Sequence, residues 1–295
     1  MKEFFEMLAG AWWGILILTV SAVFIWFLLS ALLYRVFFKR FYDILLSGLA
    51  LLILSPLFIL IAVLVRAKLG KPVIFTQARP GKKNKIFRMR KFRTMTDGRD
   101  AEGNLLPDQE RLTRFGKFLR AASLDELPGI WDIFRGKMSI IGPRPQLIKD
   151  LVFMDDDIKR RHRVRPGLTG LAQVSGRNNI SWDKRFAFDL AYVKKINIFS
   201  DIKIFFKTIF KVFKRADVAT DGMATSEDYG DFLLRTDRIT QEEYNEKLAQ
   251  MQELINHKKN TQADIVAILE KPEYNLFDTA MQENEIIQSE AQYDE

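Results

Sequence analysis

The sequence contains no cysteine and only two histidines, His162 and His257, among its 295 residues. Without cysteine the chain can form no disulfide, no zinc–thiolate site and no thiolate nucleophile. Two histidines leave little room for a histidine-based metal centre or catalytic triad. Any catalysis by this chain is therefore expected to rest on carboxylates, arginines and lysines.

Acidic residues are scarce over the first 215 positions and abundant after them. Residues 1–215 hold 39 Lys and Arg against 18 Asp and Glu, whereas residues 216–295 hold 6 against 19. This shift predicts a boundary near Arg215 between a basic part of net charge +21 and an acidic extension of net charge −13. With 48% hydrophobic residues, the chain is long enough for one sizeable core and additional elements.

One uncharged segment near the start, residues 7–34, is long enough to cross a membrane. Its 28 residues would form a helix of roughly 42 Å, more than the ~30 Å hydrocarbon core requires. No basic start or small-residue cleavage site marks it as a removable signal peptide. Basic residues are concentrated after the segment, so the positive-inside rule predicts that the N-terminus lies outside and that residue 35 onward lies in the cytoplasm. We assign residues 1–40 to this anchor.

A second uncharged segment, residues 44–65, would reach roughly 33 Å as a straight helix, which also suffices to span. Ser55 and Pro56 lie in its middle, where proline removes a backbone hydrogen bond and kinks a helix. Basic residues flank the segment on both sides, and a spanning helix would place the second group outside with the whole basic part. We therefore predict a re-entrant helix within residues 41–70; a second spanning helix with a tolerated proline is the alternative.

Residues 85–95 alternate apolar and basic side chains with a period of two, which is typical of a strand. A strand this cationic beside a membrane suits the phosphate groups of a nucleotide or a lipid. Lys91 and Arg93 are therefore candidate phosphate-binding residues, and a solvated basic edge strand is the alternative. Around it we expect a short strand at 71–75, a turn at 78–82 and a mobile loop at 97–110.

A pair of adjacent carboxylates, Asp125 and Glu126, lies in this basic part of the chain. The helix predicted over residues 112–120 ends at Arg120, five residues before the pair. Carboxylates in a cationic setting can stay ionised and can bind a hard cation. The pair therefore suggests a metal or phosphate site, with Arg120 as a phosphate-binding residue.

A structural role for the pair is the competing interpretation, because Ser123 and Glu126 match a capping box. Pro128 argues against it, since a proline at the fifth helical position would disturb the first turn. We instead predict a helix that begins at Pro128 and ends before Gly136. The carboxylates would then lie just ahead of a helix N-terminus, where anions and phosphates are stabilised.

The turn Gly-Pro-Arg-Pro at residues 142–145 is rigid, because each proline fixes its own φ and lacks an N–H donor. It presents Arg144 with little conformational freedom, which favours bidentate phosphate binding. A merely structural turn is the alternative.

A second basic turn occupies residues 163–170. After it we expect a short strand at 171–174 and a loop at 175–179. Gln173 and Arg177 in these segments are candidates for nucleotide or phosphate contacts.

Between the two turns, residues 148–161 are predicted to form one helix. Its three consecutive aspartates, residues 155–157, could mimic a metal-binding cluster but are better interpreted as a solvated helix face. His162 follows among arginines and is not expected to be a metal ligand.

Residues 201–215 place lysines on one helical face and large apolar side chains on another. This arrangement indicates a helix that lies in the interface of an anionic membrane, although an ordinary core-packing helix is the alternative.

The acidic extension, residues 216–295, contains one well-marked helix at 241–257, with Thr240 and Glu243 as a capping box. A short part of it, residues 237–248, faintly resembles C-terminal oligomerisation motifs. We expect a regulatory or partner-binding extension with disordered parts, which could serve a homo-oligomer or another protein.

Several motifs occur together, and they resemble those of the bacterial sugar transferase family, the monotopic phosphoglycosyl transferases. They are Lys-Phe-Arg-Thr-Met at 91–95, Asp-Glu at 125–126, Gly-Pro-Arg-Pro at 142–145, Arg-Pro-Gly-Leu-Thr-Gly at 165–170 and Gln-Val-Ser-Gly-Arg-Asn at 173–178. The resemblance extends from about Phe41 to Phe213. Together with the patterns above it implies a membrane-associated α/β fold, with a transmembrane helix, a re-entrant helix and a mostly helical cytoplasmic catalytic domain with short strands over residues 71–215.

The resemblance implies transfer of a sugar phosphate from a nucleotide sugar, usually UDP-linked, to polyprenyl phosphate at the bacterial inner membrane. Asp125 would be the nucleophile that becomes a phosphosugar intermediate, Glu126 would hold Mg²⁺, and Arg120 and Arg144 would bind phosphate. Asp132 departs from the family, in which asparagine is common at that position, and the departure leaves the contacts of its helix open.

Two other functions fit parts of the sequence. A membrane-tethered nucleic-acid binder would explain the basic part, but its cations lie chiefly beside prolines and carboxylates, which suits diphosphates better. A non-enzymatic scaffold of glycan assembly is the second. The expected partners are a UDP-sugar, polyprenyl phosphate and membrane lipids, without nucleic acid. The acidic extension could add a homo-oligomer or a glycan-pathway protein as a partner.

Overall fold

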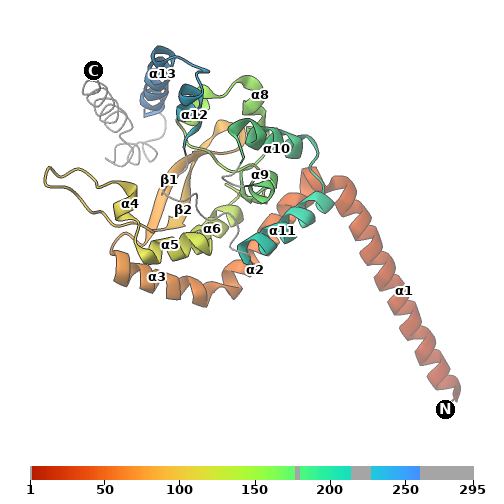
Figure 1. Cartoon of the computed structure of the whole chain (residues 1–295). Coiled ribbons are helices and arrows are strands. Elements are labelled where there is room, and N and C mark those ends of the chain that lie inside the picture. The colour runs from red at the N-terminus through yellow and green to blue at the C-terminus, as the bar shows by residue number, and fades with distance from the viewer. Residues whose placement is uncertain (1, 177–179, 214–226, 260–295) are drawn as a thin grey trace.

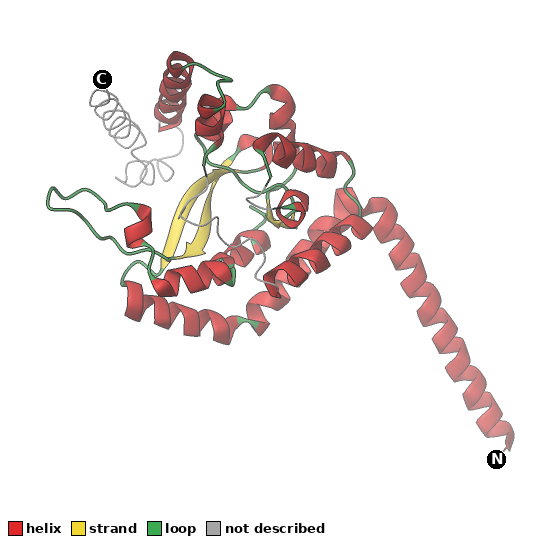
Figure 2. Ribbon diagram, viewed as in Figure 1, coloured by secondary structure: helices red, strands yellow, loops and turns green. Residues whose placement is uncertain are grey.

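The computed structural model describes residues 2–176, 180–213 and 227–259 (Figure 1). Within these ranges the protein is mostly helical, with two small two-stranded sheets at its centre (Figure 2). Arg177 and residues 260–295 lie outside the described residues, so the predictions made for them stay predictions. The expectation of a mostly helical domain with short strands is confirmed.

The N-terminal helix α1, Lys2–Leu33, extends away from the rest of the molecule (Figure 1). A π-helical turn, Tyr34–Phe38, joins it to α2, Lys39–Ile53. Among the described residues one stretch, Trp12–Ile53, is long and apolar enough to cross a membrane, with a mean hydropathy of 2.6 over its best window. A helix that could serve as the expected membrane anchor is thus present.

The second apolar segment is broken where the sequence predicts. Helix α2 ends at Ile53 and α3, Ser55–Leu69, begins after a non-helical residue, Leu54. In a continuous helix the carbonyl of Leu52 would accept the N–H of residue 56, but Pro56 has none. The Ser55 hydroxyl donates to that carbonyl instead, at 2.8 Å, so the Leu52 carbonyl keeps a hydrogen bond at the break.

Helix α3 has an inward and an outward face. Its inward face packs on the body of the protein in a cluster of Ile61, Val65, Leu69, Phe92 and Leu119. Its outward face leaves Ile59, Leu60 and Val63 at least 55% exposed. An apolar face of this kind, without protein cover in the described residues, is typical of a helix in contact with lipid.

A long hairpin crosses the molecule between the membrane-proximal helices and the C-terminal helices (Figure 2). Strand β1, Ile74–Pro80, pairs antiparallel with β2, Ile86–Phe92, and a 3-10 turn at Lys82–Asn84 joins them. The expected strand at 71–75 and turn at 78–82 were therefore placed too early. Pairing continues to Pro80 because this proline lies at the last paired position, next to the turn, where its missing N–H costs little.

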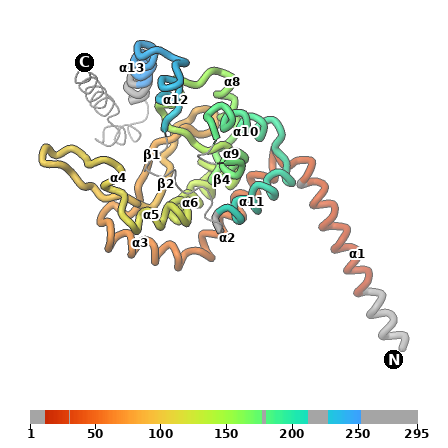
Figure 3. The backbone as a smooth tube through the Cα atoms, in the orientation of Figure 1, coloured from red at the N-terminus to blue at the C-terminus, as the bar shows by residue number. Residues whose placement is uncertain are grey.

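The chain between β2 and the next long helix projects from the body (Figure 3). It contains a short helix α4, Asp108–Arg111, so the expected loop at 97–110 is partly helical. Helix α5, Arg114–Ala121, then confirms the helix predicted at 112–120. Thr113 caps it by accepting the Gly116 N–H at 3.0 Å.

The second sheet is short and parallel, with β3, Ser139–Ile141, beside β4, Gly167–Thr169. The predicted strand at 171–174 is wrong, because these residues begin helix α9, Leu171–Ser175. The strand lies earlier because the backbones of β4 and the 142–145 turn meet very closely. A Cβ on Gly167 would lie 2.1 Å from the Gly142 nitrogen, so only glycine fits there.

The single helix predicted at 148–161 is also wrong. The structure has α7, Asp150–Phe153, then α8, Asp156–Lys159, and a 3-10 turn, Arg160–Arg163. Met154 is extended and follows the first helix, and Asp155 starts the second, since its side chain accepts the Ile158 N–H at 2.7 Å. The three aspartates at 155–157 are exposed, as expected.

Two longer helices follow, α10, Trp182–Lys194, and α11, Ile198–Phe213. Helix α11 meets the first residue of α2 through the Lys39–Asp201 ion pair, and it leaves its aromatic face uncovered in the described residues. Phe199, Phe206 and Phe210 are each at least 55% exposed, whereas Ile204 on the same helix is buried in a core cluster with Ile141 and Tyr192. The helix packs on the core by one face, and its place in a membrane interface stays a prediction.

The acidic extension contributes α12, Tyr229–Arg235, and α13, Gln241–Lys259. The predicted capping box is confirmed, because Thr240 Oγ1 accepts the Glu243 N–H at 3.1 Å and the Glu243 carboxylate accepts the Thr240 N–H at 2.9 Å. Residues 229–248 do not stand apart from the basic part. They share with it a buried cluster of Phe153, Met154, Trp182, Phe186, Tyr229, Phe232, Leu233, Tyr244 and Leu248.

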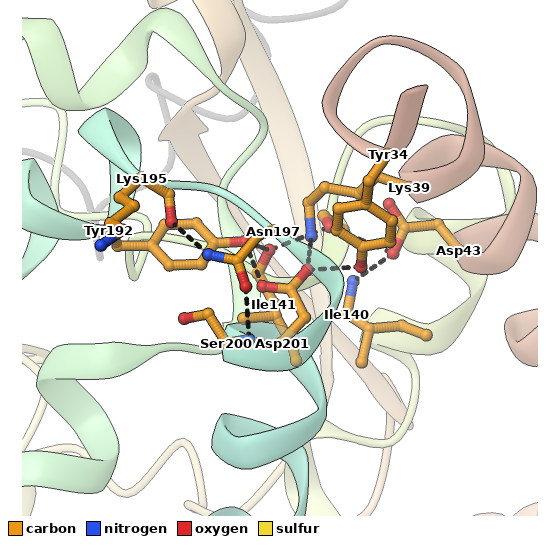
Figure 4. Close-up of polar contacts among 11 residues, drawn as sticks. Tyr34, Lys39, Asp43, Ile140, Ile141, Tyr192, Lys195, Asn197, Ser200 and Asp201 are labelled. Atoms are coloured by element: carbon orange, nitrogen blue, oxygen red, sulfur yellow. Dashed lines mark hydrogen bonds and ion pairs between the residues drawn. The ribbon is translucent and has the colours of Figure 1, made fainter. Parts of the chain in front are cut away.

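A buried polar network fastens the end of the membrane helix to the domain (Figure 4). Asp201 of α11 accepts hydrogen bonds from the Tyr34 hydroxyl at 2.7 Å, the Lys39 ammonium at 2.6 Å and the Tyr192 hydroxyl at 2.9 Å. This one carboxylate therefore ties together the π-helical turn, α2, α10 and α11.

Asp43 of α2 makes a second tie next to the first (Figure 4). One of its oxygens accepts the Ile140 N–H at 2.9 Å and the Ser139 hydroxyl at 3.1 Å. Because β3 leads directly into the 142–145 turn, this contact fixes that turn relative to the membrane helices.

Candidate active site

Asp125 and Glu126 lie in a 3-10 turn, Leu124–Glu126, between α5 and α6, Gly129–Phe134. Ser123 has a left-handed φ of 55° and makes no side-chain cap, so the capping-box interpretation is wrong. Pro128 immediately precedes α6, and the chain passes Gly136 with a positive φ of 78°, as the predicted start and end of this helix require.

Helix α3 supports the carboxylate pair through apolar packing. Leu124 and Leu127, which flank the pair, pack against the cluster that α3 forms with Phe92 and Leu119. The same apolar packing that seats α3 on the body therefore sets the position of the two carboxylates.

Glu126 is held by two cations from different parts of the chain. Its Oε1 accepts from the Lys91 ammonium at 2.8 Å and from the Arg144 guanidinium at 2.9 Å. Burial alone would raise the pKa of Glu126, but Arg144 and Lys91 outweigh it and hold the pKa well below its usual range. Glu126 is therefore a permanent carboxylate.

The pKa of Asp125 shifts in the opposite direction, above its usual range. Its residue is 7% exposed, and burial together with the adjacent Glu126 charge raises the pKa of its carboxyl, against Lys91, Arg120 and Arg144. Two neighbouring carboxylates with pKa values moved apart can take two different chemical roles. Asp125 is therefore the more basic of the two carboxylates, and Glu126 is the one that stays ionised.

The cations around the pair come from three elements. Lys91 extends from β2, Arg120 from α5, where its Nε donates to Thr94 Oγ1 at 3.0 Å, and Arg144 from the 142–145 turn. The side chain of Arg144 is 44% exposed, so it can meet a substrate while it pairs with Glu126. The structure thus brings together three of the predicted phosphate-binding residues.

Other predicted site residues have different surroundings. Arg93 is buried, and its guanidinium bonds to the carbonyl oxygens of Lys71 and Met95 and pairs with Asp97 at 2.5 Å. The Gln173 amide donates to the Leu168 carbonyl at 3.4 Å, and its buried Oε1 has no hydrogen-bond partner in the described part of the chain. Direct phosphate contacts by these two residues stay predictions.

Sequence reasoning missed the residues that support Arg144. The backbone oxygen of Arg144 accepts a hydrogen bond from Arg161 at 2.5 Å, and Arg161 is fully buried in an ion pair with Asp189 at 2.6 Å. The only sequence signal was the run of basic residues at 160–163, which gave no indication that Arg161 is buried.

Asp132 faces β2. It is fully buried, accepts the Arg90 N–H at 3.0 Å and pairs with the Arg90 guanidinium. The carboxylate therefore has a compensating cation and joins α6 to the strand that carries Lys91.

The carboxylate pair has the donor chemistry for a magnesium ion. Mg²⁺ is commonly bound by one or two carboxylates plus waters and substrate phosphate oxygens, rather than by a cage of protein ligands. The described residues contain no group of three or more acidic or histidine side chains that could hold a metal. Asp125 and Glu126 fit the smaller donor set, with Glu126 as the permanently ionised member.

A helix apolar enough to cross a membrane, joined to a basic domain with paired carboxylates among arginines and a lysine, suits phosphorylated substrates at a membrane surface. The sequence model of the bacterial sugar transferase family matches residues 34–215, and the chain belongs to that family. The matched region contains the whole carboxylate site and ends before α12.

Several curated relatives cover the same region. The chain is 43% identical over 189 residues to the uncharacterized sugar transferase EpsL of Bacillus subtilis, a match that spans 64% of this chain and 94% of the relative. It is 39% identical over 186 residues to the UDP-glucose:undecaprenyl-phosphate glucose-1-phosphate transferase of Klebsiella pneumoniae, covering 60% of this chain and 40% of that protein. It is 37% identical over 196 residues to the undecaprenyl-phosphate galactose phosphotransferase of Salmonella typhimurium, covering 61% and 41%.

Proposed function

We propose that this protein transfers a sugar 1-phosphate from a UDP-sugar to undecaprenyl or another polyprenyl phosphate. The products are a polyprenyl diphosphate sugar, which initiates a capsule, exopolysaccharide or related glycan, and UMP. Family membership and the named activities of the relatives support the reaction class. The observation that carries the proposal is the buried Asp125 next to a permanently ionised Glu126, with three cations around them.

In the first half-reaction an oxygen of ionised Asp125 attacks the phosphorus that carries the sugar. A bond forms between that oxygen and phosphorus, the bond from phosphorus to the bridging diphosphate oxygen breaks, and UMP leaves with the electron pair. A carboxylate needs no general base, which suits a site built without histidine or cysteine. In the second half-reaction an oxygen of polyprenyl phosphate attacks the same phosphorus and Asp125 is released as a carboxylate.

The cations stabilise the negative charge that moves during both steps. Lys91 and Arg144 now neutralise Glu126, and a diphosphate would offer them stronger acceptors at the same place. Glu126, with Asp125 beside it, would hold Mg²⁺, which would supply positive charge to the diphosphate and the leaving group. Arg120, beside Asp125, favours the ionised nucleophile.

The membrane arrangement is part of the same proposal. Helices α2 and α3 form a re-entrant pair that enters and leaves the cytoplasmic leaflet of the inner membrane, with the N-terminus of α1 outside. The break at Ser55–Pro56, the uncovered faces of α3 and α11 and the basic flanks support this topology. Since Leu124 and Leu127 pack on α3, the carboxylates would lie at headgroup depth, where a polyprenyl phosphate presents its charge.

The proposal is tested with full-length protein in lipid nanodiscs and a panel of UDP-sugars. We expect UMP release with at least one sugar, dependent on Mg²⁺ and sustained over many turnovers only when polyprenyl phosphate is present. Asp125→Asn should abolish release while the variant keeps the wild-type melting profile. A wild-type protein that releases no UMP with any sugar would favour a non-enzymatic scaffold of glycan assembly.

A further inference from the structure

The segment that follows the family's matched region is docked on the domain. We call residues 227–251 the docked segment; its α12 and the start of α13 pack against α7 and α10 through stacked and edge-on aromatic rings. Tyr229 lies 4.8 Å from Phe186 and 5.4 Å from Trp182, and Tyr244 stacks on Phe153 at 5.3 Å, all between ring centroids. Outside this cluster, Lys149 pairs with Asp228 at 2.5 Å.

Hydrogen bonds connect the docked segment to the turn that carries Arg144. Asp150 is 1% exposed; one oxygen accepts the Tyr229 N–H at 3.1 Å and the other accepts the Leu147 N–H at 3.0 Å. Leu147 lies three residues after Arg144. A single buried carboxylate therefore joins the first residue of α12 to the chain that leaves the 142–145 turn.

A second connection passes through α10. The Tyr229 ring packs on the Phe186 ring, and the Arg161 guanidinium lies 5.6 Å from the centroid of that ring. Arg161 donates to the Arg144 backbone oxygen at 2.5 Å while it pairs with Asp189. The docked segment is thus connected to Arg144 by two routes, one through Asp150 and Leu147 and the other through Phe186 and Arg161.

We propose that the docked segment is a brace that positions Arg144 against Glu126 and the substrate phosphate. Asp150 is a positioning residue in this account, because it touches neither Glu126 nor the space beside it and acts through Leu147. The family's matched region supplies the chemistry, and this chain adds a segment that holds one of its cations in place. The inference rests on the proposed function for the role of Arg144, but the contacts themselves can be tested without it.

Gly230 provides a way to loosen the brace without touching the active site. A Cβ at this position would lie 2.6 Å from Cε2 and 2.9 Å from Cζ of Phe153, both buried ring atoms. Gly230→Ala must therefore push α12 away from α7. Phe153→Leu removes those two atoms, so the double variant should recover part of the docking.

The first experiment measures UMP release by full-length variants in nanodiscs. We expect Gly230→Ala to lower kcat/KM by roughly 10-fold or more, since a small misplacement of a catalytic cation can cost about 100-fold. In an Arg144→Gln background, Gly230→Ala should cause almost no further loss, because the residue it positions is gone. Glu242→Gln changes an exposed side chain of the docked segment and is the matched control, with activity unchanged.

The second experiment uses hydrogen exchange, which needs no activity. Amides of residues 145–153 should exchange faster in Gly230→Ala and in Asp150→Asn, which cannot accept both N–H groups, while amides of α5 stay unchanged. Gly230→Ala with Phe153→Leu should restore part of the protection. The brace is refuted if hydrogen exchange at residues 145–153 is unchanged in both single variants. It is also refuted if Gly230→Ala lowers kcat/KM by the same factor with and without Arg144. Absence of UMP release by the wild type would refute the proposed function instead, and exchange would still decide whether the contact exists.

Discussion

Asp201→Asn tests how firmly the membrane helix is joined to the domain. Asp201 is 4% exposed and its carboxylate accepts three hydrogen bonds, from Tyr34, Lys39 and Tyr192. Asparagine keeps the shape but removes the charge and replaces one acceptor oxygen by a donor. Lys39, whose side chain is 14% exposed, then loses its counter-charge in a largely buried place.

The expected cost follows from that loss. Removing one partner of a buried ion pair destabilises a protein by about 3–5 kcal/mol, and the residual exposure of Lys39 favours the lower end, about 3 kcal/mol. For a chain of this size, a loss of 1 kcal/mol in the free energy of unfolding lowers the melting temperature by roughly 2 °C. We therefore expect a decrease of about 6 °C. Scanning fluorimetry in nanodiscs at one fixed heating rate measures it, because membrane proteins often unfold irreversibly.

Two variants complete the test. Asp156→Asn changes a carboxylate whose side chain is 99% exposed and should leave the melting temperature unchanged. Lys39→Met combined with Asp201→Leu removes both charges and should be less destabilised than the two single changes together predict. An Asp201→Asn protein that melts within about 1 °C of the wild type would show that this network does not hold the junction, and the reasoning would fail.

Two further predictions concern the active site. Because only ionised Asp125 can attack, kcat/KM should fall as the pH falls through its raised pKa. Arg120→Gln removes a cation that lowers this pKa, so it should move the acidic limb of the pH profile to higher pH. An acidic limb that stays in place would contradict the assignment. Glu126→Gln should raise the Mg²⁺ concentration needed for half-maximal UMP release by at least about 10-fold, whereas an unchanged Mg²⁺ dependence would separate Glu126 from the metal.

Local sequence signals predicted the elements that depend on local physics. Pro128 and Gly136 marked the limits of α6, Thr240 and Glu243 marked the start of α13, and Ser55–Pro56 marked the break between α2 and α3. In each case a missing N–H or a capping side chain decides the structure within a few residues. Such signals need no knowledge of the rest of the fold.

Elements that depend on distant partners were mispredicted or missed. The strand at 167–169 exists because its backbone meets the 142–145 turn, and its glycines resembled a simple turn in the sequence. The pairing of Lys91 with Glu126 joins β2 to the 3-10 turn across 35 positions, which no spacing rule reveals. The same holds for the Tyr229 contacts of the docked segment, although the opposite net charges of the two parts of the chain were compatible with docking.

The central claim, that Asp125 is the nucleophile, is tested most directly by the mass of the protein itself. Full-length protein in nanodiscs is incubated with Mg²⁺ and an active UDP-sugar, without polyprenyl phosphate, and is then denatured and weighed by mass spectrometry. The account predicts that the wild-type mass increases by one sugar phosphate, located on Asp125, that addition of polyprenyl phosphate removes it, and that Asp125→Asn never gains it. A wild type that turns over without ever carrying the adduct, or an Asp125→Asn protein that carries it, would contradict the account.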